Sequence, residues 1–281
     1  MEGRCADLSE AAGEPLGATA TTAERWLLVE VPGPWPRDVA DEGPLPEEAH
    51  HAVSTWARET PRSRVQFIRR PGRAGKPPVA VFIRSEEGVG EVRRIELGSH
   101  SDLAELDFEV AGDPVQSSFV LVCGHGRRDQ CCALRGTAVF DALSDRLGEE
   151  ELWFSSHQGG HRFAANVLVL PVGLQFGRVG PEVAPLVAAR AVAGRIELEH
   201  YRGRTCYDPT VQAAELAVRL AAGLEGVADV SLEGIEDSTV TFRTFGGARY
   251  SAAVAHAEGP LVPASCGADP APQPVLLARV L

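Results

Sequence analysis

Four residues between Cys123 and His161 could together bind a metal. Cys123 and Cys132 are separated by eight residues, and His157 and His161, in the segment HQGGH, are separated by three. Thiolate sulfur and imidazole nitrogen favour zinc, copper or an iron–sulfur cluster over calcium or magnesium. The sequence therefore predicts that function resides in this stretch.

Flanking segments are expected to place these side chains at the ends of secondary-structure elements. Residues 118–122 (SFVLV) predict a buried strand that ends at Cys123, and a helix is expected to begin at Cys132 or its neighbour. The N-terminus of a helix lowers the pKa of a thiol and so favours a thiolate ligand. We expect HQGGH to be a compact loop, because glycines inside a helix cost about 1 kcal/mol each.

Gly159 and Gly160 are predicted to contact a cofactor, because glycine lets the backbone approach a bulky group and offers amides to sulfide. Two cysteines and two histidines also suit Zn²⁺. The eight-residue gap between the thiols disfavours a zinc finger without excluding zinc. A Rieske centre is excluded because its ligands come as short Cys–His pairs, whereas here both cysteines precede both histidines.

The order of elements predicts an α/β fold. After the helix, residues 152–155 are expected to form a strand, residues 166–170 and 174–178 a hairpin, and residues 181–193 a helix. Strand, helix, strand, hairpin and helix is the order of a thioredoxin-like domain. The same order recurs, more weakly, in the strands and helix predicted at residues 26–31, 46–59, 64–70, 79–84 and 92–97.

Three regions follow from this reading. Residues 113–207 are expected to form the thioredoxin-like domain with the ligands, and residues 1–112 are hypothesised to be a degenerate copy without them. Residues 208–281, with one helix followed by strands, predict a small α+β segment.

Composition excludes several classes of function. A net charge of −12 argues against nonspecific binding to nucleic acid, which needs clustered cations. No apolar run reaches the roughly 18 residues of a membrane span, and the N-terminus is too acidic for a secretory signal. The six cysteines are then expected to be reduced thiols or ligands in a cytoplasmic protein.

The spacing C-x8-C followed by HxGGH, with HGRRDQCCALRG and HRFAANVLVLP around it, resembles the sucrase/ferredoxin-like family of thioredoxin-like [2Fe–2S] proteins. The resemblance extends from about Trp26 to about Tyr207. It implies that Cys123 and Cys132 hold one iron, and that His157 and His161 hold the other.

The function that this resemblance implies is electron transfer or redox sensing by a [2Fe–2S] cluster, with proton-coupled one-electron chemistry. Such a protein is an electron carrier rather than a stand-alone enzyme, and its partner would be an unidentified reductase or electron acceptor, with no nucleic acid and no membrane involved. Two alternatives stay open: a structural scaffold with Zn²⁺, and a thiol oxidoreductase. The last is weaker, because the two-residue spacing of redox thiols is absent.

The remaining candidates receive no catalytic role. Cys131 is expected to be a packed or free thiol, and His125 a surface histidine. The arginines at positions 127 and 128 are expected to be solvated, with an alternative role in offsetting the charge of the site or in docking an electron donor. Three more cysteines lack a partner at ligand spacing and are assigned no role: Cys5, Cys206 and Cys266.

Overall fold

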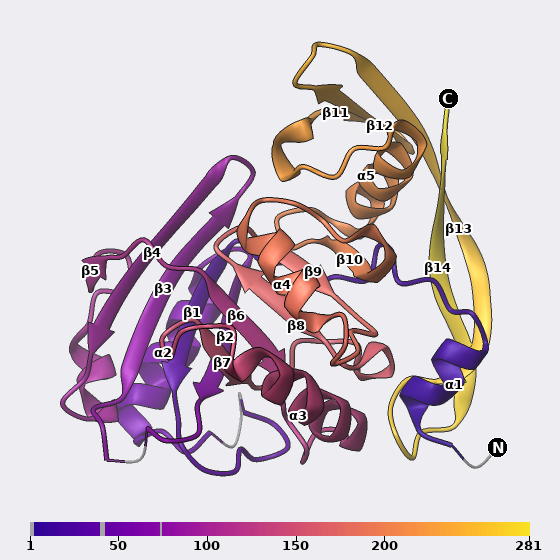
Figure 1. The fold of residues 1–281 in the computed structure, drawn as a ribbon. Coiled ribbons are helices and arrows are strands. Elements are labelled where there is room, and N and C mark those ends of the chain that lie inside the picture. Colours follow the sequence, from indigo (N-terminus) through magenta and orange to yellow (C-terminus); the bar gives the residue numbers. More distant parts are fainter. Residues whose placement is uncertain (1–2, 40–42, 74) are drawn as a thin grey trace.

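The computed structural model describes residues 3–39, 43–73 and 75–281 (Figure 1). Within this part of the chain, ten strands form one sheet in the order β10-β9-β8-β6-β7-β2-β1-β3-β4-β5. A second sheet has the order β11-β12-β13-β14. The predicted α/β class is therefore confirmed.

The first half of the large sheet is a parallel pair of strands followed by an antiparallel hairpin. Strands β1 and β2 are parallel and are connected through α2, while β3 lies antiparallel to β1 and pairs with β4. Its elements are β1 (Arg25–Glu30), α2 (Glu47–Glu59), β2 (Ser63–Arg69), β3 (Val79–Glu86), β4 (Val89–Glu96), η1 (His100–Glu105) and β5 (Asp113–Pro114).

The second half repeats this arrangement. Strands β6 and β7 are parallel and are connected through α3, while β8 lies antiparallel to β6 and pairs with β9. Its elements are β6 (Phe119–Cys123), α3 (Gln130–Ser144), β7 (Leu152–Ser155), η2 (His161–Phe163), β8 (Val167–Leu170), β9 (Leu174–Phe176), α4 (Ala184–Val192), η3 (Leu198–His200) and β10 (Tyr201–Arg204). The helix expected from residue 181 thus begins three residues later.

The two halves meet edge to edge at β2 and β7, where only Ile68 pairs with Ser155 and Arg69 with Phe154. Alternate side chains of a strand lie on opposite faces. One face of each half is covered by helices, α2 on the first half and α3 with α4 on the second. The opposite faces of the two halves contribute to one shared core. It contains Trp26 and Leu28 from the first half and Leu121 from the second. The helices are therefore the outer layers.

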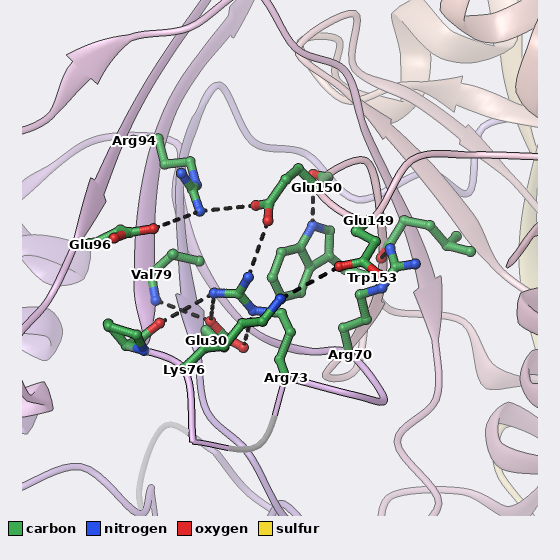
Figure 2. A network of polar contacts seen from close by, with 12 residues as sticks. Glu30, Arg70, Arg73, Lys76, Val79, Arg94, Glu96, Glu149, Glu150 and Trp153 are labelled. Carbon is green, nitrogen blue, oxygen red and sulfur yellow. Dashed lines mark hydrogen bonds and ion pairs between the residues drawn. The ribbon is translucent and has the colours of Figure 1, made fainter.

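A polar network also joins the halves (Figure 2). Arg73 is buried and holds both carboxylate oxygens of Glu30, at 2.8 and 3.1 Å. Its third nitrogen reaches Glu150 at 3.1 Å, and Glu150 also pairs with Arg94 at 2.9 Å. Because Glu150 lies in the loop before β7, this network ties the loop after β2 to the second half.

The C-terminal segment is a helix packed on a four-stranded antiparallel sheet, as predicted. Its last hairpin is longer than expected and extends beyond α5 to the N-terminal helix α1 (Cys5–Ala11) (Figure 1). The other elements are α5 (Pro209–Ala222), η4 (Val227–Asp229), β11 (Val230–Glu236), β12 (Thr239–Thr244), β13 (Arg249–Pro263) and β14 (Pro270–Val280). In the described part of the chain, no helix combines the length and apolarity that a membrane crossing needs.

Candidate metal centre

The structure brings the two predicted thiols into contact. Cys123 is the last residue of β6, Cys132 is the third residue of α3, and both are buried. A hydrogen-bonding interaction with Cys132 holds the pKa of Cys123 well below its usual range, with a smaller contribution from His157. The same interaction raises the pKa of Cys132, and burial raises it as well. Ligand atoms of Cys123, Cys132 and His157 all lie within 4.8 Å of one another.

Gly136 permits this contact. It lies one helical turn after Cys132, on the same face of α3. A Cβ atom at Gly136 would meet the carbonyl oxygen of Cys123 at 2.2 Å. Only glycine therefore allows the first turns of α3 to lie against the end of β6. The sequence offered one unused signal for this role, which is a glycine in the interior of a predicted helix.

His157 and His161 are stacked, with ring centroids 4.2 Å apart and an angle of 23° between the ring planes. The Nδ1 atom of each ring is buried and has no hydrogen-bond partner among the described residues. Burial and, to a smaller extent, the neighbouring His157 together lower the pKa of His161 to about 4. A neutral imidazole with an unpaired buried nitrogen is the form that binds metals.

The segment from His157 to His161, here called the ligand loop, forms a loop, as predicted. Side chains from other elements donate hydrogen bonds to its carbonyl groups. Arg64 donates to the oxygen of His157 at 2.9 Å, Gln175 to Gln158 at 3.3 Å, Arg202 to Gly159 at 3.0 Å, and Asn166 to Gly160 at 3.0 Å. A ligand loop fixed by outer hydrogen bonds presents its imidazoles in one orientation.

Gly159 and Gly160 have φ values of +93° and +69°, which side chains other than glycine rarely adopt. A Cβ atom at Gly160 would also lie 2.6 Å from Arg202. The loop therefore requires both glycines for its conformation. Their contact with a cofactor stays a prediction.

His125 is not the surface histidine that the sequence suggested, because only 2% of it is exposed. Its Nδ1 accepts from the backbone amide of His157 at 3.3 Å, which leaves Nε2–H to donate to the carbonyl of Pro36 at 2.7 Å. The ring also packs edge-on against Trp35. His125 thus positions the start of the ligand loop, and burial lowers its pKa.

A buried cation lies beside the thiols, and the sequence did not reveal it. Arg202 is 2% exposed and donates to Thr19, Gly159 and Asn166, all uncharged. Burial lowers its pKa to about 9, while Cys123 and Cys132 act in the opposite direction. We therefore assign the offsetting of the thiols' negative charge to Arg202 before the arginines at positions 127 and 128.

The remaining cysteines separate into two groups. Cys206 is buried just before the C-terminal segment and packs in its core, and burial raises its pKa to about 11. Cys5 and Cys266, which the sequence left without partners, instead meet Cys131 and Asp129 at a second position. That part of the sequence-based assignment is wrong, because the partners come from opposite ends of the chain.

The fold is α/β, and Cys123, Cys132 and His157 form a group that could hold a metal ion, while His161 lies outside this group and stacks on His157. A sequence model of the sucrase/ferredoxin-like family matches residues 16–203, about two thirds of the chain. The chain therefore belongs to the sucrase/ferredoxin-like family.

Fungal relatives share part of the chain. Altered inheritance of mitochondria protein 32 of Eremothecium gossypii is 32% identical over 137 residues, which cover 43% of each chain. The protein of the same name from Debaryomyces hansenii is 35% identical over 109 residues, which cover 35% of this chain and 39% of the relative. The one from Clavispora lusitaniae is 37% identical over 102 residues, which cover 33% of this chain and 37% of the relative. The matches thus span less than half of these curated relatives. No solved structure matches the chain significantly.

Proposed function

We propose that this protein is an electron carrier or redox sensor that holds a [2Fe–2S] cluster through Cys123, Cys132, His157 and His161. The observation that carries the proposal is the meeting of a buried thiol pair with His157, on which His161 is stacked, together with the buried Nδ1 atoms of both rings, which have no hydrogen-bond partner in the described structure. Two thiolates and two neutral imidazoles are a donor set that iron–sulfur clusters use.

When bound, the cluster would accept and return one electron. Cys123 and Cys132 would hold the buried iron, and their burial excludes water from that side. His157 and His161 are partly exposed, so they would hold the iron nearer to solvent. With Nδ1 as ligand, the Nε2 atom of each imidazole stays available to take up a proton when the site is reduced. Arg202 adds a fixed positive charge that stabilises the reduced, more negative site.

The exposed histidine side is where we expect a reductase or an electron acceptor to approach. Arg128, in the loop between the two thiols, is partly exposed and lies 3.9 Å from Asp38. This partner, like the cytoplasmic location, stays a proposal.

The interpretation of both halves as thioredoxin-like copies is also a proposal. It rests on the strand order and strand directions that the two halves share.

A second candidate function is a scaffold with structural zinc. It is favoured by one observation: the ligand atoms of Cys123, Cys132 and His157 are close enough together to surround a single ion. The thiol oxidoreductase has less support. The lowered pKa of Cys123 suits a nucleophile, but Cys123 is 1% exposed and Cys132 is 0% exposed, which closes both thiols to a disulfide substrate.

The deciding experiment is anaerobic purification, followed by visible absorption, EPR after dithionite, and iron and zinc counts on one sample. The proposal predicts red-brown protein with about two irons and a reduced signal of low average g. Cys123→Ser should lose the colour, whereas Cys206→Ser, which alters a buried thiol away from the site, should keep it. Colourless protein with zinc at these four residues, even after reconstitution with iron and sulfide, would refute electron transfer and support the scaffold.

A further inference from the structure

A second cluster of metal-binding side chains lies next to the first. Three thiols and one carboxylate meet there: Cys5 at the start of α1, Asp129 and Cys131 at the start of α3, and Cys266 in the turn between β13 and β14. Up to 261 residues of sequence separate these partners. Cys5, Asp129 and Cys131 are buried, and Cys266 is partly buried.

The spacing of these atoms is that of a tetrahedral zinc site. The three sulfurs lie 3.5, 3.6 and 3.7 Å apart. Oδ1 of Asp129 lies 3.4 Å from the sulfur of Cys266 and 3.7 Å from that of Cys5. Zn–S bonds of about 2.3 Å and Zn–O bonds of about 2.0 Å give tetrahedral edges of about 3.8 Å between sulfurs and about 3.5 Å between sulfur and oxygen.

The surroundings hold these donors in place. The backbone amides of Cys131 and Cys266 each donate to one oxygen of Asp129 at 2.8 Å, which orients the carboxylate. Arg135, one turn after Cys131 on α3, pairs with Asp7 at 2.6 Å and so anchors α1 independently of any metal. No two of the sulfurs are at the distance of a disulfide bond, which is about 2.05 Å.

We propose that Cys5, Asp129, Cys131 and Cys266 form a structural Zn²⁺ site that clamps α1 and the turn between β13 and β14 to the start of α3. Four protein ligands from a thiolate-rich set leave no open position, which is the arrangement of structural rather than catalytic zinc. The site is independent of the proposed [2Fe–2S] function, because it shares no ligand with it.

Metal counts on full-length variants test the proposal. Wild-type protein purified under reducing conditions should carry about one zinc per chain at this site. Cys266→Ser should lose that zinc and keep its iron and visible spectrum. Cys123→Ser should show the reverse, and Cys206→Ser should match the wild type. Wild-type protein without zinc, or zinc that disappears with Cys123→Ser and persists with Cys266→Ser, would overturn the site.

Asp129→Asn isolates the carboxylate ligand. Asn caps a helix as well as Asp does, so this variant should fold with α3 intact. Competition with a chromophoric chelator should show that zinc affinity falls by at least about 10- to 100-fold. A loss of roughly that size is typical when a residue that only hydrogen-bonds to a metal ligand is substituted. An unchanged affinity would remove Asp129 from the site. Peptide mapping without reductant gives the last check, because a disulfide between two of the three cysteines in the isolated protein would contradict zinc binding.

Discussion

Substituting Gly136 with Ala tests how the two thiols of the candidate metal centre are brought together. In an isolated helix, this change would be stabilising by about 1 kcal/mol, because alanine has the higher helix propensity. Here the added Cβ would meet the carbonyl oxygen of Cys123 at 2.2 Å. Non-bonded heavy atoms are at their optimum near 3.5 Å. The start of α3 must therefore move away from β6 by about 1 Å.

That displacement is larger than a metal site tolerates. Cys132 moves with the helix, and ligand distances must stay within about 0.2 Å of their ideal values. Overpacking of this kind costs about 1–3 kcal/mol. Because the clash is with backbone rather than with a flexible side chain, we expect the upper end of that range. After the gain in helix propensity is subtracted, Gly136→Ala should be destabilised by about 2 kcal/mol and should lose most of its metal.

Two measurements check this expectation. Denaturant unfolding of metal-free protein gives the change in stability, and metal counts with the visible spectrum give retention of the site. Gly234→Ala is the matched control, because a Cβ atom at Gly234 meets nothing within 4 Å. If Gly136→Ala kept full metal and wild-type stability while Gly234→Ala did the same, the contact between α3 and β6 would not be what sets the ligand geometry.

Three further outcomes are expected. Arg73→Ala should lower the free energy of unfolding by about 3–5 kcal/mol in denaturant titrations, because it leaves buried Glu30 without its ion pair. Arg58→Ala breaks an exposed ion pair and, as the control, should change that free energy by less than about 0.5 kcal/mol. The raised pKa of Cys206, about 11, predicts that iodoacetamide at about pH 8 labels this thiol only after unfolding, and rapid labelling of native protein would contradict its burial. In potentiometry of metal-loaded protein, the reduction potential should fall by about 59 mV per pH unit, because reduction takes up a proton. His161→Cys should keep a cluster, and the reduction potential of that cluster should be lower than in the wild type. A potential that is flat between about pH 6 and 9 would remove the proton coupling.

The sequence predicted those features of the site that depend on local patterns. An apolar pentapeptide before Cys123 predicted the strand, a helix-forming segment predicted α3, and paired glycines in HQGGH predicted a loop; all three are confirmed. The family motif identified the candidate ligands because their spacing along the chain is fixed.

Contacts between distant segments were not predictable in this way. Cys266 reaches Cys5 and Cys131 only because a long C-terminal hairpin extends to α1, and the predicted strands did not indicate how the hairpin would be oriented. The burial of His125 depends on Trp35 and Pro36, which belong to the other half of the sheet. Arg202 looks like a surface residue in sequence, and only the topology places it behind the ligand loop.

The consecutive residues Cys131 and Cys132 connect the two proposed sites. In a helix, neighbouring side chains differ in direction by about 100°. One thiol of this pair therefore points to Cys123 and the other to Cys5, so the first turn of α3 supplies a ligand to each site. A metal bound by Cys131 would hold that first turn of α3 against α1 and the turn between β13 and β14. Because the two sites share no ligand and Arg135 anchors α1 independently of any metal, the loss of zinc in Cys266→Ser should leave the iron and the visible spectrum of the first site unchanged.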